Sequence, residues 1–410
     1  MPTSTVGQPG PVAVWITASG WAAAARRRYG RSWIVTPHGV ISPEEALATA
    51  TRPSLRSKER PGWRRHVPRI VATARKDLVR TVAARRFRDA ALHGPWMSAG
   101  IAFVWQRHEL FHTAGFRAAR ALGCPLILFV DAPIVWEEAS WGVRRPGWGT
   151  FLEAVGERPQ LRSADLVACV SEEVAEQVVA RGVPEERVVV TPNGVDPELF
   201  NPDVSGLAVR NRLGLDGAFV VGWVGSFRRF HGVDAAVRAA ARLQDSVPEL
   251  TLLLVGDGLE RPRIEQLARE LGLRRVVFTG TVPYEEMPAH IGAMDAALVL
   301  DAGDLGFHYS PLKLKEYMAC GKPVIGPRVG QVARTMTDGV DGLLVEQGDL
   351  QALARAIQGL DRDPDLRRAL GRAARDRVVL EGSWDLQLER ALAALDRRAA
   401  VVPSAREGST

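Results

Sequence analysis

The sequence predicts an α/β protein with two domains, each a doubly wound parallel sheet with helices on both faces. At 410 residues the chain is too long for one ordinary hydrophobic core. Short apolar runs rich in Val, Ile and Leu recur between longer amphipathic stretches. Because these runs lack polar alternation, they are typical of strands that helices cover on both faces. They fall into two sets, which predicts two such domains.

Each set contains six predicted strands. The first comprises the runs at 12–17, 32–36, 99–105, 125–131, 165–171 and 187–192. The second comprises the runs at 219–225, 250–256, 275–280, 295–300, 322–326 and 342–346. Between the sets, TPNGVDPELFNPD (191–203) is crowded with turn residues. We therefore expect an N-terminal domain over 1–195 and a C-terminal domain over 196–382.

The chain closes with a predicted helix over 383–399. Trp384, Leu386, Leu388, Leu392 and Leu395 recur there at helical spacing. We expect this helix to pack back on the N-terminal domain, and residues 400–410 to form a disordered tail.

Composition narrows the class of protein. With 46% hydrophobic and 24% charged residues the chain is globular, and a net charge of +6 is too modest to indicate nucleic acid. The three cysteines show neither metal spacing nor a disulfide framework. The apolar segment PVAVWITASGWAAAA is followed, not preceded, by basic residues and is too short to span a membrane. These features favour a soluble cytoplasmic protein.

One strongly basic helix is predicted over 68–92. Its apolar face is expected to comprise Ile70, Val71, Ala74, Leu78, Val82 and Phe87. The basic residues gather elsewhere on the helix, so two interpretations stay open. The first is a surface helix with a solvated basic face, and the second is contact with an anionic membrane surface or an anionic acceptor.

The segment DAALVLDAGDLGFHYSPLKLKEYMACGKPVIG (295–326) reads as strand, loop, helix and strand. Ser310 is a good helix N-cap, and Pro311 suits the first helical position. Free amides over 309–313 and the helix dipole would then form an anion site, to which Lys313 adds a charge. One turn later, Glu316 is placed to accept hydrogen bonds from two vicinal hydroxyls. Phosphates and a diol together indicate a nucleotide. The alternative is a capped helix with an ordinary Lys–Glu pair.

A second loop, in VGWVGSFRRFHGVDAAV (221–237), strengthens the nucleotide interpretation. Gly225 and Ser226 allow backbone amides to approach a phosphate, and Arg228, Arg229 and His231 supply further donors. The segment is neither a Walker loop nor a GxGxxG fingerprint. A third strand-to-loop turn begins at Gly256. For His231 the alternative is an ordinary loop histidine.

Together these motifs resemble the retaining glycosyltransferases of family 4 (glycosyl transferases group 1), in the subgroup with Ser-Pro-Leu-Lys in the donor-site helix. The resemblance covers most of the chain. It is carried by the segments VVVTPNGVDPELFNP, PELTLLLVGDGLERPRIEQLARELGL, VVFTGTVPYEEMPAHIGAMDAALVL, SPLKLKEYMACGKPVIG and VWQRHELFHTAGFRAARALGCPLILFVDAPIVWEEA. It implies the GT-B fold, in which two Rossmann-like domains face each other across a cleft.

The resemblance also implies roles for individual residues. Glu316 matches the glutamate that holds the ribose hydroxyls, and Val282 matches a strand end whose backbone reads the base. The diphosphate would be bound by Gly225, Ser226, Arg229, His231, Gly256, Ser310, Pro311, Leu312 and Lys313. The usual Arg and Lys of the phosphate loop are absent, so Arg228, Arg229 and Lys313 are expected to substitute.

One position departs from the family pattern. The family has two glutamates eight positions apart, and the first of these positions is His308 here. That glutamate touches the donor sugar, so His308 and Tyr309 become the donor-sugar candidates, and the identity of the sugar stays open.

The implied reaction is sugar transfer from a nucleoside-diphosphate sugar, with UDP or GDP as the nucleotide. Amides, Lys313 and Arg228 would stabilise the leaving diphosphate, so neither a metal nor a cofactor is expected. Asp131 would orient or deprotonate the acceptor hydroxyl. Its alternative role is that of a cap or loop aspartate. Arg107 and Glu138 are weaker acceptor-side candidates.

The sequence thus predicts a retaining glycosyltransferase that acts on a natural product or a cell-envelope glycan. Two alternatives remain. One is a nucleotide-sugar epimerase of the same fold, and the other is a basic membrane-docking module with a vestigial nucleotide site.

Overall fold

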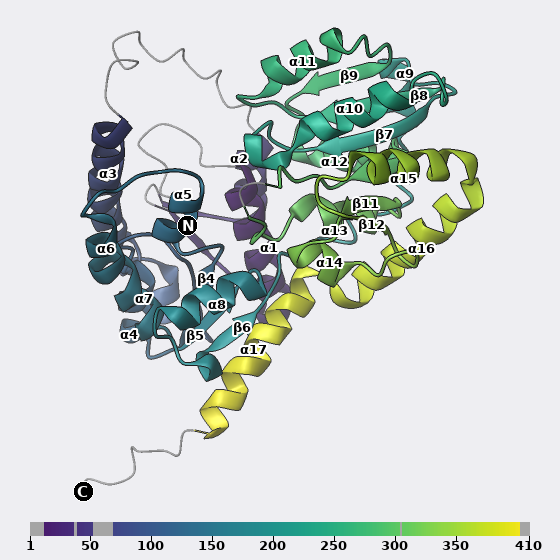
Figure 1. Cartoon of the computed structure of the whole chain (residues 1–410). Helices are drawn as coiled ribbons and strands as arrows, with labels where there is room; N and C mark the ends of the chain where they lie inside the picture. The colour runs from purple at the N-terminus through teal and green to yellow at the C-terminus, as the bar shows by residue number, and fades with distance from the viewer. Residues whose placement is uncertain (1–11, 37–38, 52–68, 304–305, 402–410) are drawn as a thin grey trace, which may run out of the picture. The chain divides into compact units, whose positions relative to one another are not determined.

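The computed structural model describes residues 12–36, 39–51, 69–303 and 306–401. The chain divides into two compact units (Figure 1). The second unit is Asn193–Trp384, and the first contains nearly all described residues before it together with those from Asp385 onward. The chain enters and leaves the second unit at adjacent points, because Val195 N donates to Gly382 O at 3.0 Å and Trp384 N donates to Val195 O at 3.3 Å.

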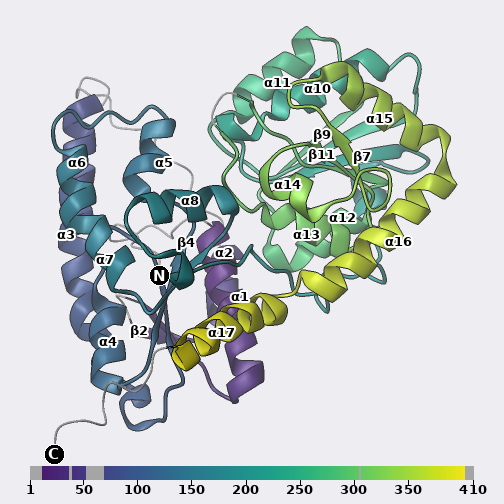
Figure 2. The same ribbon diagram turned by 60° about the horizontal axis from the view of Figure 1, so that its bottom comes forward.

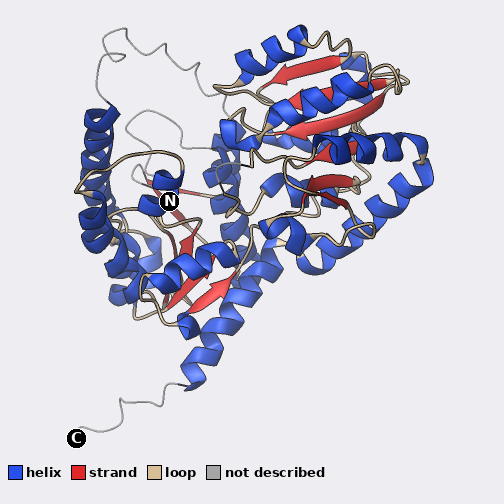
Figure 3. Ribbon diagram, in the orientation of Figure 1, coloured by secondary structure: helices blue, strands red, loops and turns tan. Residues whose placement is uncertain are grey.

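The second unit is built on a six-stranded sheet in the order β12-β11-β10-β7-β8-β9, with every neighbouring pair parallel (Figure 3). All six strands predicted for this domain are therefore confirmed. Their bounds are β7 Phe219–Val224, β8 Leu250–Val255, β9 Val276–Gly280, β10 Ala296–Leu298, β11 Val324–Pro327 and β12 Leu343–Val345.

Helices cover both faces of this sheet, which explains the continuous apolar runs. Along β7, Val221 and Trp223 pack on one face with α10, α11 and α15, whereas Val220 and Val224 pack on the other with α12, α13 and α14. Successive strand residues point to opposite faces, so both faces must be apolar. The helices are α9 Leu207–Leu213, α10 Val233–Leu243, α11 Arg261–Glu270, α12 Met287–Gly292, α13 Leu312–Ala319, α14 Gly330–Thr335, α15 Leu350–Arg362 and α16 Pro364–Glu381.

The first unit contains a four-stranded parallel sheet in the order β3-β4-β5-β6. The strands are β3 Val104–Arg107, β4 Leu126–Val130, β5 Leu166–Cys169 and β6 Val188–Val190. The helices after the first are α2 Pro43–Thr51, α3 Arg69–Ala90, α4 Ala114–Leu122, α5 Ile134–Ser140, α6 Gly149–Leu152, α7 Arg158–Ser163 and α8 Glu172–Ala180. A π-helical turn, Glu153–Glu157, joins α6 to α7.

One strand prediction in the first unit was wrong, and one predicted strand lies outside the parallel sheet. The run at 12–17 opens helix α1, Val12–Tyr29, whose buried residues include Trp15, Ile16 and Trp21. A short apolar run is compatible with a buried helix as well as with a strand, and the alanines that follow favour the helix. The run at 32–36 does form strand β1 (Ile34–Thr36), but it pairs antiparallel with β2 (Gly39–Ile41) instead of joining the parallel sheet.

Helix α3 is confirmed as a helix, but of its predicted apolar face Phe87 is buried and most of the other residues are not. Ile70, Val71, Leu78 and Val82 are exposed, with Leu78 at 65%, whereas Asp77 is buried. Asp77 accepts from Arg145 Nε at 2.8 Å, from Arg145 Nη2 at 3.0 Å and from the Trp148 indole at 3.1 Å. This inward ion pair orients the helix, and α3 lies beside α6 in both Figure 1 and Figure 2.

The C-terminal helix α17, Trp384–Val401, joins the first unit through its charged side chains. Arg27 of α1 donates from Nε and Nη2 to Asp385 at 2.8 and 2.7 Å, and Arg28 pairs with Glu389. Of the helices in the described part of the chain, none is both long and apolar enough to cross a membrane.

Candidate functional site

The strand order of the second unit defines where a ligand would bind. From β7 the chain proceeds through β8 and β9 on one side, and β10, β11 and β12 lie on the other. Strand order therefore reverses between β7 and β10. Open parallel sheets bind ligands at this switch point, beyond the carboxyl ends of the strands. The loops that follow β7 and β10 carry most of the predicted nucleotide-binding residues.

These two loops are in direct contact. Gly232 has φ +56°, and a Cβ there would lie 2.4 Å from the carbonyl oxygen of Asp301. Ala302 N donates to Phe230 O at 3.2 Å. A side chain at Gly232 would force the loops apart, so glycine is required at this position.

The turns after β7 and β8 also touch through their backbones. Gly256 has φ +126°, and a Cβ there would lie 2.0 Å from the carbonyl oxygen of Gly225. Phe227 N donates to Asp257 O at 3.0 Å, which links the same two turns. Gly225 and Gly256 therefore allow a close pair of loops at the end of the sheet.

Lys313, in the first turn of α13, points to this pair of loops. A Cβ on Gly225 would lie only 2.8 Å from its Nζ, and the Nζ sits 4.3 Å from the centre of the Trp223 ring. Lys313 is 9% exposed, and among the residues that the structure describes its ammonium has no hydrogen-bond partner. Burial lowers the pKa of Lys313 to about 7, although Glu316 acts in the opposite direction. A buried ammonium that makes no hydrogen bond to the described residues is suited to a phosphate.

Glu316 lies one turn further along α13 and is also buried. The Tyr284 hydroxyl donates to its Oε1 at 2.8 Å. Burial raises the pKa of Glu316 to about 7, against the effects of Tyr284 and Lys313. A carboxylate can accept several hydrogen bonds, so this single bond leaves capacity for two ribose hydroxyls.

His231 is held as a neutral imidazole. Burial lowers its pKa to about 2, and Lys313 and Arg228 act in the same direction. Its ring packs against Phe230 at 4.2 Å and Trp223 at 5.7 Å between centroids. It can therefore offer one donor and one acceptor, but no charge. Arg228 and Arg229 next to it are exposed.

The start of α13 differs from the predicted cap. The helix begins at Leu312, Pro311 occupies the N-cap position, and no side chain caps it. Ser310 instead accepts from the Asn193 backbone at 3.1 Å through Oγ, and its carbonyl accepts from Asn193 Nδ2 at 2.9 Å. The assignment of Ser310 as the N-cap was therefore wrong. The amides of Leu312 and Lys313 still have no acceptor within the helix, as at any helix start.

The donor-sugar candidates lie just before this helix. Tyr309 stacks on Phe307 at 4.2 Å, and its buried hydroxyl has no hydrogen-bond partner. Burial raises the pKa of Tyr309, so the group is a neutral donor. His308 is buried next to it. Val282, the predicted base reader, is partly buried beside Tyr284.

In the first unit the structure brings Arg107 and Asp131 together. Arg107 Nε donates to Asp131 Oδ2 at 2.6 Å, and its Nη1 pairs with Glu109. Burial disfavours the charged guanidinium, but the two carboxylates outweigh it and raise the pKa of Arg107. Asp131 follows β4 and is not the cap of α5, whose N-cap is Pro133.

Glu138 has a different environment. Its oxygens accept from Lys76 and Arg80 at 2.8 and 2.7 Å and from Arg145. Burial opposes the carboxylate, but Arg80 and the other two cations lower the pKa of Glu138 to about 2. These bonds make Glu138 part of the ion cluster under α3, which also contains Asp77.

Sequence reasoning missed Tyr284, Trp223 and Asn193, which contact Glu316, Lys313 and Ser310 respectively. Trp223 reads as an ordinary core residue, and the other two lie in turn segments. Their partners are distant in the sequence, and no local pattern signals such contacts.

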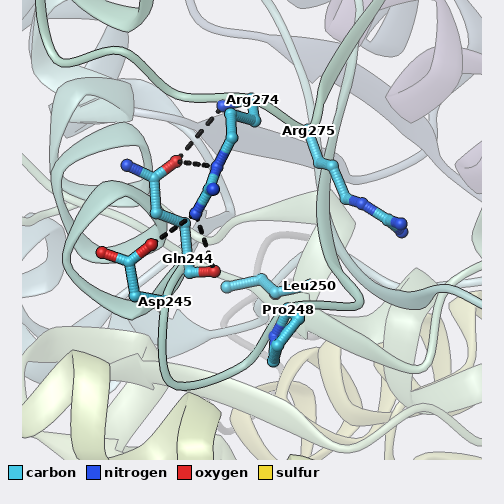
Figure 4. A pocket seen from close by; sticks show the side chains of 6 residues that line it. All are labelled: Gln244, Asp245, Pro248, Leu250, Arg274 and Arg275. Atoms are coloured by element: carbon cyan, nitrogen blue, oxygen red, sulfur yellow. Dashed lines mark hydrogen bonds and ion pairs between the residues drawn. The ribbon is translucent and has the colours of Figure 1, made fainter.

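A hollow of about 270 Å³ lies elsewhere on the second unit, against the first residue of β8 (Figure 4). Arg274, which lines it, hydrogen-bonds Gln244 and pairs with Asp245. The hollow lies at the amino end of β8, away from the loops that follow β7 and β10. Within the described ranges, no three His, Cys, Asp or Glu side chains are grouped for a metal ion.

Comparison with known proteins places these observations in a family. The model described as "Glycosyl transferases group 1" matches residues 218–363, and the model described as "Glycosyltransferase Family 4" matches residues 47–199.

Several curated proteins are similar in sequence. The GDP-mannose-dependent alpha-(1-6)-phosphatidylinositol monomannoside mannosyltransferase of Mycolicibacterium smegmatis is 31% identical over 60% of this chain and 64% of its own length. The D-inositol 3-phosphate glycosyltransferase of Kribbella flavida is 33% identical over 58% of each chain. The 2-deoxystreptamine glucosyltransferase of Streptomyces kanamyceticus is 34% identical over 61% of this chain and 65% of its own. The matched regions thus span less than two thirds of each relative.

Solved structures agree on the fold. The sucrose-phosphate synthase of Thermosynechococcus elongatus superposes with a TM-score of 0.65 at 25% identity, over 95% of this chain and 94% of its own. Anabaena HepE, solved with UDP and glucose, gives a TM-score of 0.63 at 18% identity, over 95% and 98%. With both family models and these structures in agreement, the chain belongs to the family-4 glycosyltransferases and has the GT-B fold.

Proposed function

We propose that this protein transfers a sugar from a nucleoside-diphosphate sugar to a hydroxyl of a natural product or a cell-envelope glycan, with retention at the anomeric carbon. The observation that carries the proposal is the buried, unpartnered ammonium of Lys313 beside Gly225, with Glu316 one turn further on. Three relatives bear glycosyltransferase names, and one of these names includes GDP-mannose. UDP and GDP are the proposed nucleotides.

The proposed chemistry is leaving-group stabilisation. When the anomeric C–O bond breaks, its electron pair goes to the diphosphate, which gains negative charge. Lys313, the free amides of α13 and exposed Arg228 are preorganised to stabilise that charge, so we propose that no metal is needed. The acceptor hydroxyl attacks from the same face, and its proton passes to the leaving phosphate. Asp131, with Arg107, is the proposed group that orients the hydroxyl.

The direct test of the function is a panel of UDP-, GDP- and dTDP-sugars with mixed hydroxyl acceptors, assayed in excess EDTA. We expect one donor class to give a glycosylated product with the anomeric configuration retained, as read by NMR. Activity lost in EDTA and restored by Mn²⁺ would overturn metal independence. Formation of an epimerised nucleotide sugar without transfer would favour the epimerase. Absence of nucleotide-sugar binding by calorimetry would favour a vestigial site.

Glu316→Gln tests the proposed ribose contact. Removing the carboxylate should weaken binding of the preferred nucleoside diphosphate by about 1–3 kcal/mol, because a charge-assisted hydrogen bond is lost. The variant should also lose the preference for the ribonucleotide over its 2′-deoxy analogue, measured by calorimetry. Glu270→Gln on α11, whose carboxylate bonds Gln266, is the matched control and should behave as wild type. An unchanged dissociation constant for Glu316→Gln would leave this residue as an ordinary helix glutamate.

The pH dependence of nucleotide binding tests Lys313. Its pKa is about 7 in the free protein because of burial, and a bound diphosphate should raise it. Affinity should therefore fall as pH rises above 7, where free Lys313 is neutral, and should also fall as pH drops below 7, where Glu316 is protonated. At pH 8 the nucleotide and Glu316 are both ionised. Binding should therefore take up about one proton from the buffer, and Lys313 is the group that gains it.

Calorimetry in buffers of different ionisation enthalpy measures this proton uptake. Lys313→Met should abolish it. Lys322→Met, which removes a lysine that donates to Gly292 O at 2.9 Å, should keep it. Equal uptake by wild type and Lys313→Met would contradict the assignment.

We also propose that α3 contacts an anionic membrane surface. Its outward residues Ile70, Val71, Leu78 and Val82 form an apolar stripe, and the helix sequence contains seven Lys and Arg against two Asp. Apolar insertion with basic charge nearby is the physical basis of interfacial binding.

Co-sedimentation with phosphatidylcholine vesicles, with and without phosphatidylglycerol, tests this contact. Binding should require the anionic lipid, and Leu78→Asp should weaken it several-fold. Leu380→Asp, at an equally exposed leucine of α16, should not weaken it. Binding that is independent of anionic lipid, or equal in both variants, would refute the proposal.

A further inference from the structure

The first unit contains a cavity of about 320 Å³ that the proposed donor chemistry does not use. It is lined by residues of α1, β1, α3, β3, α4 and α17, all within this unit. Four tryptophans contribute to its wall: Trp21, Trp33, Trp96 and Trp105. Trp21 and Trp105 lie with their ring centroids 4.2 Å apart. Because domain interiors are normally close-packed, an aromatic-lined space of this size is suited to an apolar ligand.

One polar group at the cavity lacks a partner among the described residues. His112 lines the cavity and is 1% exposed, and no described residue hydrogen-bonds either of its ring nitrogens. Its ring packs edge-on against Phe87 at 4.6 Å. Burial lowers the pKa of His112 to about 3, so the ring is neutral and offers one donor and one acceptor. Two unmade hydrogen bonds in an apolar site are costly, and a ligand hydroxyl could form one of them.

The cavity also reaches the acceptor-side residues. Strand β3 borders it from Val104 to Arg107, and Arg107 at the carboxyl end of the strand bonds Asp131 at 2.6 Å. Ligands of parallel sheets bind at the carboxyl ends of strands. A molecule in this cavity would therefore extend toward the Arg107–Asp131 pair.

We propose that this cavity binds the apolar body of the acceptor, so that the acceptor is a hydroxyl-bearing molecule with an apolar ring system rather than a purely polar sugar. The role as acceptor rests on the proposed transferase function. The cavity as a binding site for a neutral apolar ligand does not depend on it.

The binding test uses the full chain with 2-naphthol, naphthalene and methyl glucoside. Binding is measured by quenching of tryptophan fluorescence or by calorimetry. We expect 2-naphthol to bind about tenfold more tightly than naphthalene, the effect of one hydrogen bond, and methyl glucoside not to bind at the cavity. In His112→Phe, 2-naphthol and naphthalene should bind with equal affinity. Failure of both aromatic probes to bind, or tighter binding of the sugar, would overturn the proposal.

A filled cavity provides the second control. Ala22 of α1 lines the cavity, whereas its neighbour Ala23 does not line it and has a similar intermediate exposure. Ala22→Trp should abolish 2-naphthol binding, and Ala23→Trp should retain it. Circular dichroism and thermal melting check that both variants are folded. Binding that survives in a folded Ala22→Trp variant would place the probe elsewhere and refute the site.

The acceptor role is tested separately, with the donor that the panel identifies. 2-Naphthol should be glycosylated or should compete with the accepted substrate, and Ala22→Trp should remove that effect. If transfer to other acceptors occurs and 2-naphthol neither reacts nor competes, the acceptor role fails while the transferase stands. If no donor is used but 2-naphthol binds as expected, the transferase function fails while the binding site stands.

Discussion

The proposed nucleotide site depends on one steric constraint, the direct backbone contact between the turns that follow β7 and β8. Gly256 approaches the Gly225 carbonyl so closely that a Cβ would lie 2.0 Å from it. No other residue type tolerates both this contact and the positive φ. The same Gly225 lies against the Lys313 ammonium. A larger residue at either glycine would push the loops apart and displace the charge from the end of the sheet.

The fold places Lys313 in an environment that is unfavourable for a charge. The side chain is buried against the Trp223 ring, no hydrogen-bond acceptor reaches it, and its pKa falls toward neutrality. Such a group gains more from a bound anion than a solvated lysine would, because its desolvation has already occurred on folding. Glu316 is the complementary case, a buried carboxylate held by Tyr284. The two residues lie one turn apart on α13, and we propose that Lys313 binds phosphate and Glu316 binds hydroxyls.

The first unit places its charged and aliphatic side chains in an unusual way. Under α3, Asp77, Arg145 and Glu138 form a buried ion cluster, while the aliphatic side chains of α3 point outward. Elsewhere in the unit, four tryptophans line a space of about 320 Å³. A domain that was selected only for stability would bury its aliphatic residues and close its cavities. Both departures occur in the unit that contains the acceptor-side pair Arg107–Asp131, and both favour ligands of apolar character.

Sequence by itself determined the features that depend on local order. Continuous apolar runs located all six strands of the second unit, and the positions of Gly225, Gly256, Lys313 and Glu316 follow from strand-to-loop transitions that recur at one end of a parallel sheet. These signals are local because alternate residues of a strand must face opposite layers of helix.

Only the tertiary structure decided those features that depend on residues distant in the chain. The run at 12–17 is apolar enough for a strand or a buried helix, and in the structure it forms a helix that buries Trp15, Ile16 and Trp21. Ser310 looked like a cap, but it bonds Asn193, which is 117 positions away. The orientation of α3 is set by Arg145, which is 68 positions from Asp77. In each case the deciding partner is distant in the chain, and only folding brings it within hydrogen-bonding or packing distance.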